Sequence, residues 1–159
     1  MAQIYDPSTR TGYLAWQLGQ TAVQRIEKAL RALDLNLAQF RALVQAELTP
    51  GVSSAEIARR SGITAQSMGA AVNLLIERGL LERTPHPTNR RMMELRGTES
   101  GRALVARAEQ LVDAVQDEMF GVLSADEQGA LHALLQRLIE HANPEVLHLS
   151  APVPAGPDA

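Results

Sequence analysis

Polar side chains that can bind nucleic acid gather at two places in the middle of the chain. The first is the beginning of a predicted helix that opens at Thr64 and ends before Gly79. The second surrounds the adjacent arginines Arg90 and Arg91. An α-helix fits the major groove of DNA and presents its first turn there, whereas guanidinium groups reach phosphates or a narrow minor groove. The expected chemistry is therefore recognition of double-stranded DNA.

Base reading is expected to rest on uncharged side chains, because no lysine or arginine occurs between Thr64 and Glu77. A glutamine can pair with N6 and N7 of adenine, and a serine contacts bases with little discrimination. Alanine and glycine allow the helix to approach DNA closely. Contacts to DNA phosphates are expected from the two arginines and from the residues that cap the preceding helix. The predicted DNA-binding residues are Ser53, Ser54, Thr64, Ala65, Gln66, Ser67, Gly69, Asn73, Arg90 and Arg91.

The formal charge of −3 hides an uneven distribution of charge along the chain. Residues 78–107 carry seven arginines against three glutamates, a net charge of +4. Residues 108–159 carry one arginine against nine acidic residues, a net charge of −8. Charge sorted in this way implies one surface that faces a polyanion and another that stays away from it. A solvated face on which charges cluster by accident is the alternative interpretation.

The spacing of apolar residues predicts helices before the polar groups. A stripe with steps of three and four runs from Gly12 to Leu33, and a shorter helix begins at Leu37. Ser53 and Glu56 have the spacing of a capping box ahead of a short helix that ends at Ser61-Gly62. With the helix that Thr64 caps, this short helix forms a helix-turn-helix.

The pattern changes after Gly79, where residues 80–84 and 91–96 read as two strands. The turn between them, residues 85–89, holds two prolines, which exclude a helix and favour extended backbone before each. A helix-turn-helix followed by a basic hairpin is a winged helix-turn-helix. A helix pair whose hairpin serves only protein contact is the alternative.

Two long amphipathic segments, residues 10–34 and 98–142, flank this unit. Thr98 caps the first helix of the second segment, and Ser124 with Glu127 forms another capping box within it. The apolar faces of these two segments together are larger than the small central winged helix-turn-helix can bury. Packing against a second copy in a closed twofold dimer is therefore favoured, and packing within one chain is the alternative.

The expected fold is mainly α with a small β-hairpin wing, in a single domain over residues 1–142. The winged-helix lobe takes residues 36–96, between the dimerisation helices, and the proline-rich residues 143–159 are expected to form a flexible tail. The first residues lack the basic and apolar parts of a secretion signal, and no apolar run of about 18 residues occurs. We therefore expect a soluble, cytoplasmic protein without a membrane partner.

These motifs resemble the MarR family of bacterial transcription regulators over residues 10–142. The matching stretches are Ser53-Ser54-Ala55-Glu56-Ile57-Ala58, Gly62-Ile63-Thr64, Leu75-Ile76-Glu77-Arg78-Gly79-Leu80-Leu81-Glu82-Arg83, Pro87-Thr88-Asn89-Arg90-Arg91 and Thr98-Glu99-Ser100-Gly101. The resemblance implies a homodimer built from the first and last helices, whose two winged lobes bind a pseudo-palindromic operator. It also implies a small-molecule pocket between the lobe and the dimer region, and hence a repressor that an effector releases.

Tyr13, Trp16 and Phe40 lie on helices that border the family's pocket by resemblance, and they are the expected contacts for a small aromatic or phenolic effector. Ordinary core or dimer contacts are the alternative for these three rings.

Three residues depart from the family pattern. Asn89 stands where an acidic residue usually precedes the wing arginines, and Gly97 replaces an apolar residue before the last helices. Ala70 stands where a basic or polar residue of the recognition helix is common.

Other chemistries find no support in the sequence. The chain has no cysteine, which excludes disulfides, zinc–thiolate sites and a thiol-oxidation switch. His132, His141 and His148 are nine and seven residues apart, a spacing that suits no metal site. No nucleotide-binding or nucleophile motif occurs, so we expect no catalytic residue, metal or cofactor. Two rival functions stay open, a protein-interaction module that does not bind DNA and a DNA binder without an effector.

Overall fold

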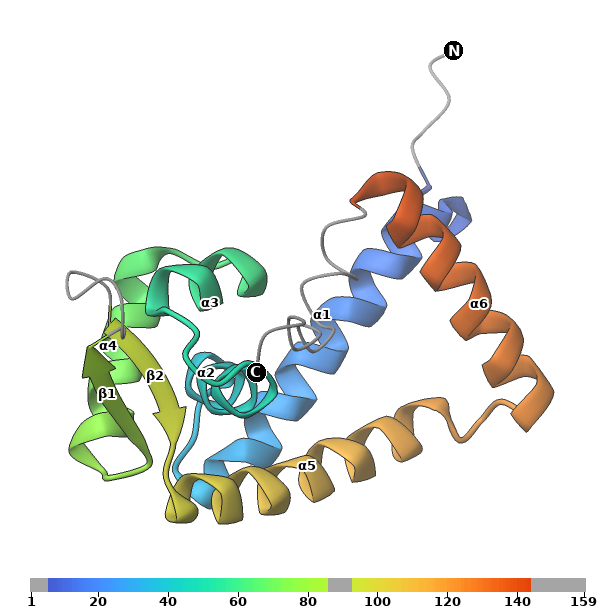
Figure 1. The fold of residues 1–159 in the computed structure, drawn as a ribbon. Coiled ribbons are helices and arrows are strands. Elements are labelled where there is room, and N and C mark those ends of the chain that lie inside the picture. Colours follow the sequence, from blue (N-terminus) through green and yellow to red (C-terminus); the bar gives the residue numbers. More distant parts are fainter. Residues whose placement is uncertain (1–5, 86–92, 144–159) are drawn as a thin grey trace, which may run out of the picture.

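The computed structural model describes residues 6–85 and 93–143 as a helical protein with one β-hairpin (Figure 1). The mainly α fold with a hairpin wing is therefore confirmed. Short 3-10 turns, η1 (Pro7–Thr9) and η2 (Arg31–Leu33), precede and follow the first helix. The remaining elements are α1 (Thr11–Leu30), α2 (Leu37–Leu48), α3 (Ser54–Ser61), α4 (Ala65–Glu77), β1 (Leu81–Pro85), β2 (Met93–Gly97), α5 (Glu99–Phe120) and α6 (Ala125–Ala142).

The link between α1 and α2 is a tight corner that redirects the chain into the lobe. Asp34 ends η2 in the left-handed conformation, with φ of 52°. Asn36 then caps α2: its side chain accepts from the Gln39 amide at 2.8 Å, and the Gln39 side chain accepts from the Asn36 amide at 2.9 Å. This reciprocal box was not predicted, although its spacing is that of a capping box.

One apolar core joins α2, α3, α4, the hairpin and the adjoining ends of α1 and α5. Its fully buried members include Leu30 at the end of α1, Leu43 of α2 and Ile57 of α3. Met68 and Leu75 enter the core from α4. Each helix thus presents one apolar face to the same cluster, which fixes the orientation of α4 within the lobe.

The hairpin is an antiparallel pair that runs from Leu81 opposite Gly97 to Pro85 opposite Met93. The strands lie within one or two residues of the predicted ranges. Val52 forms a β-bridge to the other edge of β2. There the Leu95 amide donates to the Val52 carbonyl, and the Leu95 carbonyl accepts from the Gly51 amide. The hairpin is thereby attached to the segment that precedes α3.

The start of α5 is locked to the end of α4 around Thr98, which caps α5 as predicted. The Thr98 hydroxyl accepts from the Gly101 amide at 3.0 Å and donates to the Gly79 carbonyl at 2.7 Å. A side chain at Gly101 would collide with the carbonyl oxygen of Leu80. Thr98 and Gly101 together allow α5 to begin in close contact with the lobe, because one caps the helix and the other leaves room for the Leu80 carbonyl.

The first half of α1, the end of α5 and all of α6 extend away from the lobe (Figure 1). Ser124 and Glu127 form the complete predicted capping box at the start of α6. No residue of α6 is buried, and its leucines Leu134 and Leu138 are 53% and 60% exposed. In the part of the chain that the structure describes, no helix has the length and apolar character needed to cross a bilayer.

Candidate nucleic-acid interface

The helix-turn-helix begins at α3, whose capping differs from the prediction. The Ser53 hydroxyl accepts from the Glu56 amide at 3.2 Å, so one half of the expected box forms. The Glu56 carboxylate turns instead to Arg59 at 2.8 Å and Arg60 at 2.9 Å. The predicted reciprocal box is therefore wrong, because three hydrogen bonds from the two guanidinium groups outweigh one bond from a backbone amide. Hydrogen bonds from Arg59 and then Arg60 lower the pKa of Glu56 to about 2.

Two arginines beside this turn join helices. Arg60 donates from Nη1 to Gln45 Oε1 at 3.0 Å and to Thr49 Oγ1 at 3.1 Å, at the end of α2. Arg41 of α2 donates to the Ser61 carbonyl at 3.0 Å, at the end of α3. These contacts hold α3 on α2.

The helix α4 presents a small, uncharged surface to solvent. Its opposite side, which includes Met68, Val72 and Leu75, is buried in the core. The Thr64 hydroxyl caps the helix by accepting from the Ser67 amide at 3.1 Å, and it also donates to the Ser67 hydroxyl at 2.9 Å. Of the predicted residues, the exposed ones are Thr64, Ala65, Gln66, Ser67 and Asn73, while Gly69, Ser53 and Ser54 are half-buried.

Arg83 of β1 supplies the positive charge that α4 lacks. Its Nη2 donates to Asn73 Oδ1 at 3.1 Å, and both side chains are exposed. The amide nitrogen of Asn73 remains able to donate to an acceptor on a base. Asn73 was among the residues predicted from the sequence to bind DNA, and Arg83 was not. The basic segment that contains Arg83 was the available signal, but its partner lies ten residues earlier on another element.

The tip of the wing was predicted to carry Arg90 and Arg91, and both lie outside the described residues, as does Asn89. The described part of the hairpin holds an ion pair between Arg96 and Glu94 at 3.1 Å. Glu94 is only 8% exposed, and it shares with Arg96 the face of β2 opposite the core residue Leu95.

The three aromatic residues predicted to contact an effector occupy two different settings. Tyr13 and Trp16, near the start of α1, have ring centroids 6.0 Å apart and planes tilted by 40°. Trp16 is 57% exposed. Phe40 of α2 is half-buried and packs against the core of the lobe. The structure thus brings two of the three rings together.

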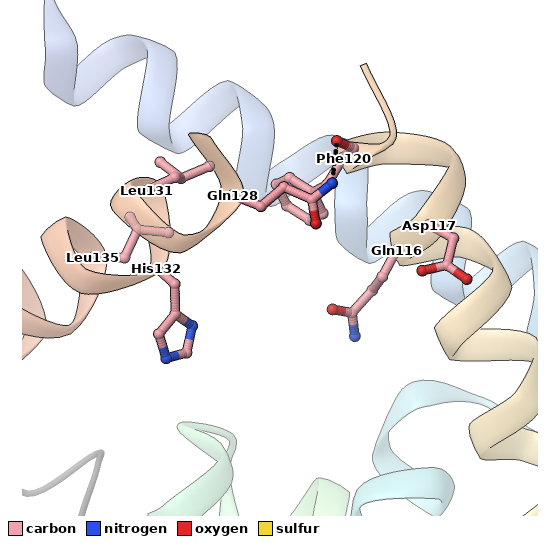
Figure 2. Close-up of a pocket in the computed structure, with 7 residues that line it drawn as sticks. All are labelled: Gln116, Asp117, Phe120, Gln128, Leu131, His132 and Leu135. Carbon is pink, nitrogen blue, oxygen red and sulfur yellow. Dashed lines mark hydrogen bonds between the residues drawn. The ribbon is translucent and has the colours of Figure 1, made fainter. Parts of the chain in front are cut away.

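A pocket of about 310 Å³ lies at the elbow between α5 and α6 (Figure 2). Gln128 donates from Nε2 to the Phe120 carbonyl at 3.2 Å and closes the elbow from the α6 side. None of the predicted aromatic residues lines this pocket. Its lining residues are Gln116, Asp117, Phe120, Gln128, Leu131, His132 and Leu135. Among residues 6–85 and 93–143, no group of three or more His, Asp or Glu residues is arranged to hold a metal ion.

Comparisons with a family model, with curated proteins and with solved structures all point to the MarR family. The model of the MarR family matches residues 33–92, which cover α2, α3, α4 and β1. The HTH-type transcriptional repressor Rv2887 of Mycobacterium tuberculosis is 32% identical over 127 residues, which make up 80% of this chain and 91% of that protein.

Solved structures of the same mycobacterial protein have the same fold. Its complex with DNA superposes with a TM-score of 0.70 at 31% identity, covering 81% of this chain and 97% of that chain. Its complex with salicylic acid gives a TM-score of 0.70 at 32% identity, covering 81% and 96% of the two chains. The likeness extends over the lobe and the flanking helices.

Proposed function

The chain belongs to the MarR family, and from this premise we propose that it is a sequence-specific DNA-binding regulator, a repressor that a small-molecule effector releases. The relative Rv2887 is named a transcriptional repressor, and it has been crystallised with DNA and with salicylic acid. A regulator of this kind acts where the chromosome lies, so we place it in the cytoplasm. We assign it no catalytic residue.

The exposed surface of α4 beside Arg83 is the observation that carries the proposal. Small residues at Ala65 and Gly69 let the helix lie deep in a major groove, where Gln66 reaches a base edge. The hydrogen bond to Asn73 holds Arg83 beside the middle of α4, and Arg83 belongs to the basic segment of the chain. In this arrangement the uncharged side chains of α4 contact the bases, and the neighbouring guanidinium groups contact the phosphates.

A homodimer accounts for the apolar surface that one chain leaves exposed. Leu14 and Leu18 of α1 are 52% and 41% exposed, and the leucines of α6 are similarly uncovered. Burial of these side chains against a second copy would contribute favourable free energy in proportion to the apolar area covered. Such a dimer carries two lobes and fits a pseudo-palindromic operator.

Release by an effector requires two arrangements of the lobes. In one arrangement both α4 helices match half-sites about one helical turn (~34 Å) apart. An effector that binds the other arrangement more tightly shifts the population away from DNA. The lobe is connected to the flanking helices at the α1–α2 corner and at the joint around Thr98.

The test is a titration of the protein against genomic DNA fragments at about 50 and 200 mM salt, the range over which phosphate contacts strongly reduce affinity. We expect a saturable complex with a subset of fragments and a steep loss of affinity at the higher salt concentration. Absence of a salt-sensitive, saturable complex at low salt would favour a protein-interaction module instead. A DNA complex that no small molecule weakens would favour a regulator without an effector.

A further inference from the structure

The hydrogen bond between Arg83 of β1 and Asn73 of α4 fixes the orientation of the Asn73 amide. An arginine side chain carries donors and no acceptor, so the atom 3.1 Å from Arg83 Nη2 has to be the oxygen Oδ1. Asn73 Nδ2 makes no hydrogen bond within the part of the chain that the structure describes, and the side chain is exposed. Asn73 therefore turns its acceptor toward the hairpin and leaves its donor for whatever lies against α4.

A side chain that offers only a donor selects a base edge that offers an acceptor. The usual pair of asparagine with adenine needs Oδ1 and Nδ2 on the same base edge, and the bond to Arg83 turns Oδ1 away from it. The positive charge of Arg83 also disfavours the amino groups of adenine and cytosine beside it. The bases that remain are thymine, which presents O4, and guanine, which presents O6 and N7.

Ala70, which is exposed one turn before Asn73, distinguishes these two bases. Side chains of an α-helix lean toward its N-terminus, so the Asn73 amide lies over the turn that holds Ala70. Leu74, which is 48% exposed, extends the apolar surface beside Ala70. Thymine carries a methyl group at C5 next to its O4 acceptor, and apolar side chains contact that methyl group favourably. Guanine has no such group, so a donor beside an apolar surface favours thymine.

We propose that Arg83 is a positioning residue for base recognition, and that the Asn73 amide it orients reads a thymine together with Ala70. Asn73 Nδ2 donates to O4 of the thymine, while the Ala70 methyl contacts the C5 methyl. The other N–H groups of Arg83 are left for a phosphate, so one side chain joins a base contact to a backbone contact. The proposal rests on the proposed function, since it names the base that one position of α4 reads.

Single-base changes in one half-site of the best fragment from the genomic titration locate the base pair that Asn73 reads. It is the pair at which the full-length wild type discriminates and Asn73→Ala does not. There the wild type is expected to bind thymine about tenfold more tightly than any other base. Uracil at that position lacks only the C5 methyl and should weaken binding by about fourfold. The same exchange should have a smaller effect on Ala70→Gly, which has no methyl to lose contact.

Arg83→Met separates the positioning role from the charge. Methionine cannot donate to Oδ1, so it frees the Asn73 amide to pair with adenine through both of its polar atoms. Arg83→Met should bind all sequences more weakly, and at the base pair of Asn73 its preference should move from thymine to adenine. Arg83→Lys, which keeps the charge and a donor, should retain the preference for thymine. Asn73→Asp, which only accepts, should prefer cytosine there.

A preference for thymine that Arg83→Met leaves unchanged would overturn the positioning role, because loss of a phosphate contact alone lowers affinity equally for all four bases. A wild type that prefers another base at this pair, or binds uracil as tightly as thymine, would overturn the assignment of thymine. If Asn73→Ala relaxes no base pair while the wild type remains sequence-specific, the proposal fails and the proposed function stands. Equal affinity of the wild type for all sequences would instead contradict the proposed function.

Discussion

Gln66 and Arg91 have different expected roles in DNA binding. Gln66 is exposed in the first turn of α4, where an amide can pair with adenine, so Gln66→Ala should cost about 1–3 kcal/mol at one base pair and relax the preference there. Arg91→Ala should weaken binding to all sequences alike, because a phosphate contact carries no sequence information. Affinities for an operator and its single-base variants measure both effects. The same uniform loss for both variants would contradict this division.

Two glycines should respond in opposite ways to one added methyl group. At Gly69 a methyl group meets no atom within 4 Å, so Gly69→Ala should raise the free energy of unfolding by about 1 kcal/mol. It should also weaken DNA binding, since the methyl fills the surface that approaches the groove.

Gly101→Ala should instead destabilise the fold by about 3 kcal/mol, because the new methyl collides with the Leu80 carbonyl where α5 meets the lobe. Thermal unfolding of the two variants, together with DNA binding by Gly69→Ala, tests the pair. Equal changes in melting temperature would show that the packing at Gly101 is not as described.

Glu56 joins both ends of α3 into one charged cluster, and this gives the element a pH dependence. The pKa of Glu56 is lowered from its ordinary value of 4.5 to about 2, first by the hydrogen bond from Arg59 and then by that from Arg60. The unfolded chain therefore takes up a proton before the folded chain does as the pH falls. The stabilisation is complete above pH 4.5 and is lost between 4.5 and about 2.

Glu56→Gln should lower the free energy of unfolding by about 1–2 kcal/mol at pH 7, a modest value because Arg59 is half-exposed. The difference from the wild type should shrink below pH 4.5 and vanish near pH 2. Chemical denaturation across this range measures it, with Glu82→Gln on exposed β1 as the control. Stability curves that stay parallel over the whole range would contradict the assigned cluster.

Helix positions could be predicted from the sequence because their signals are local. Apolar spacing located the six helices, and the caps at Thr64, Thr98 and Ser124 placed their starts within a residue or two. Contacts between elements could not be predicted this way. The Arg83–Asn73 pair joins residues that only the tertiary fold brings together, so the candidate site was predicted in part.

At the scale of the whole molecule, the separation of charge agrees with the arrangement of the elements. The basic segment 78–107 includes β1, β2 and the start of α5, on the side of the lobe. The acidic segment, from residue 108, includes the rest of α5 and α6, which extend away from the lobe (Figure 1). DNA is therefore expected to meet the lobe, while the acidic helices remain distant from it.

The dimer can be tested on α6. Leu138 is 60% exposed in one chain, and Leu138→Glu should weaken dimerisation by more than about tenfold, because apolar burial worth 1.5–3 kcal/mol per leucine is replaced by a desolvated charge. Gln136→Glu adds the same charge to another face of α6 and should leave the dimer intact. Sedimentation measures both, and a Leu138→Glu variant that dimerises like the wild type would place the dimer contact elsewhere.

The central claim is that the lobe reads a DNA sequence, and the specificity ratio tests it most directly. The ratio compares affinity for the best fragment from the genomic titration with affinity for random-sequence DNA at about 150 mM salt. A sequence-specific regulator predicts a ratio of about a thousand or more. A ratio near one would contradict the account, because phosphate attraction alone would then explain all binding.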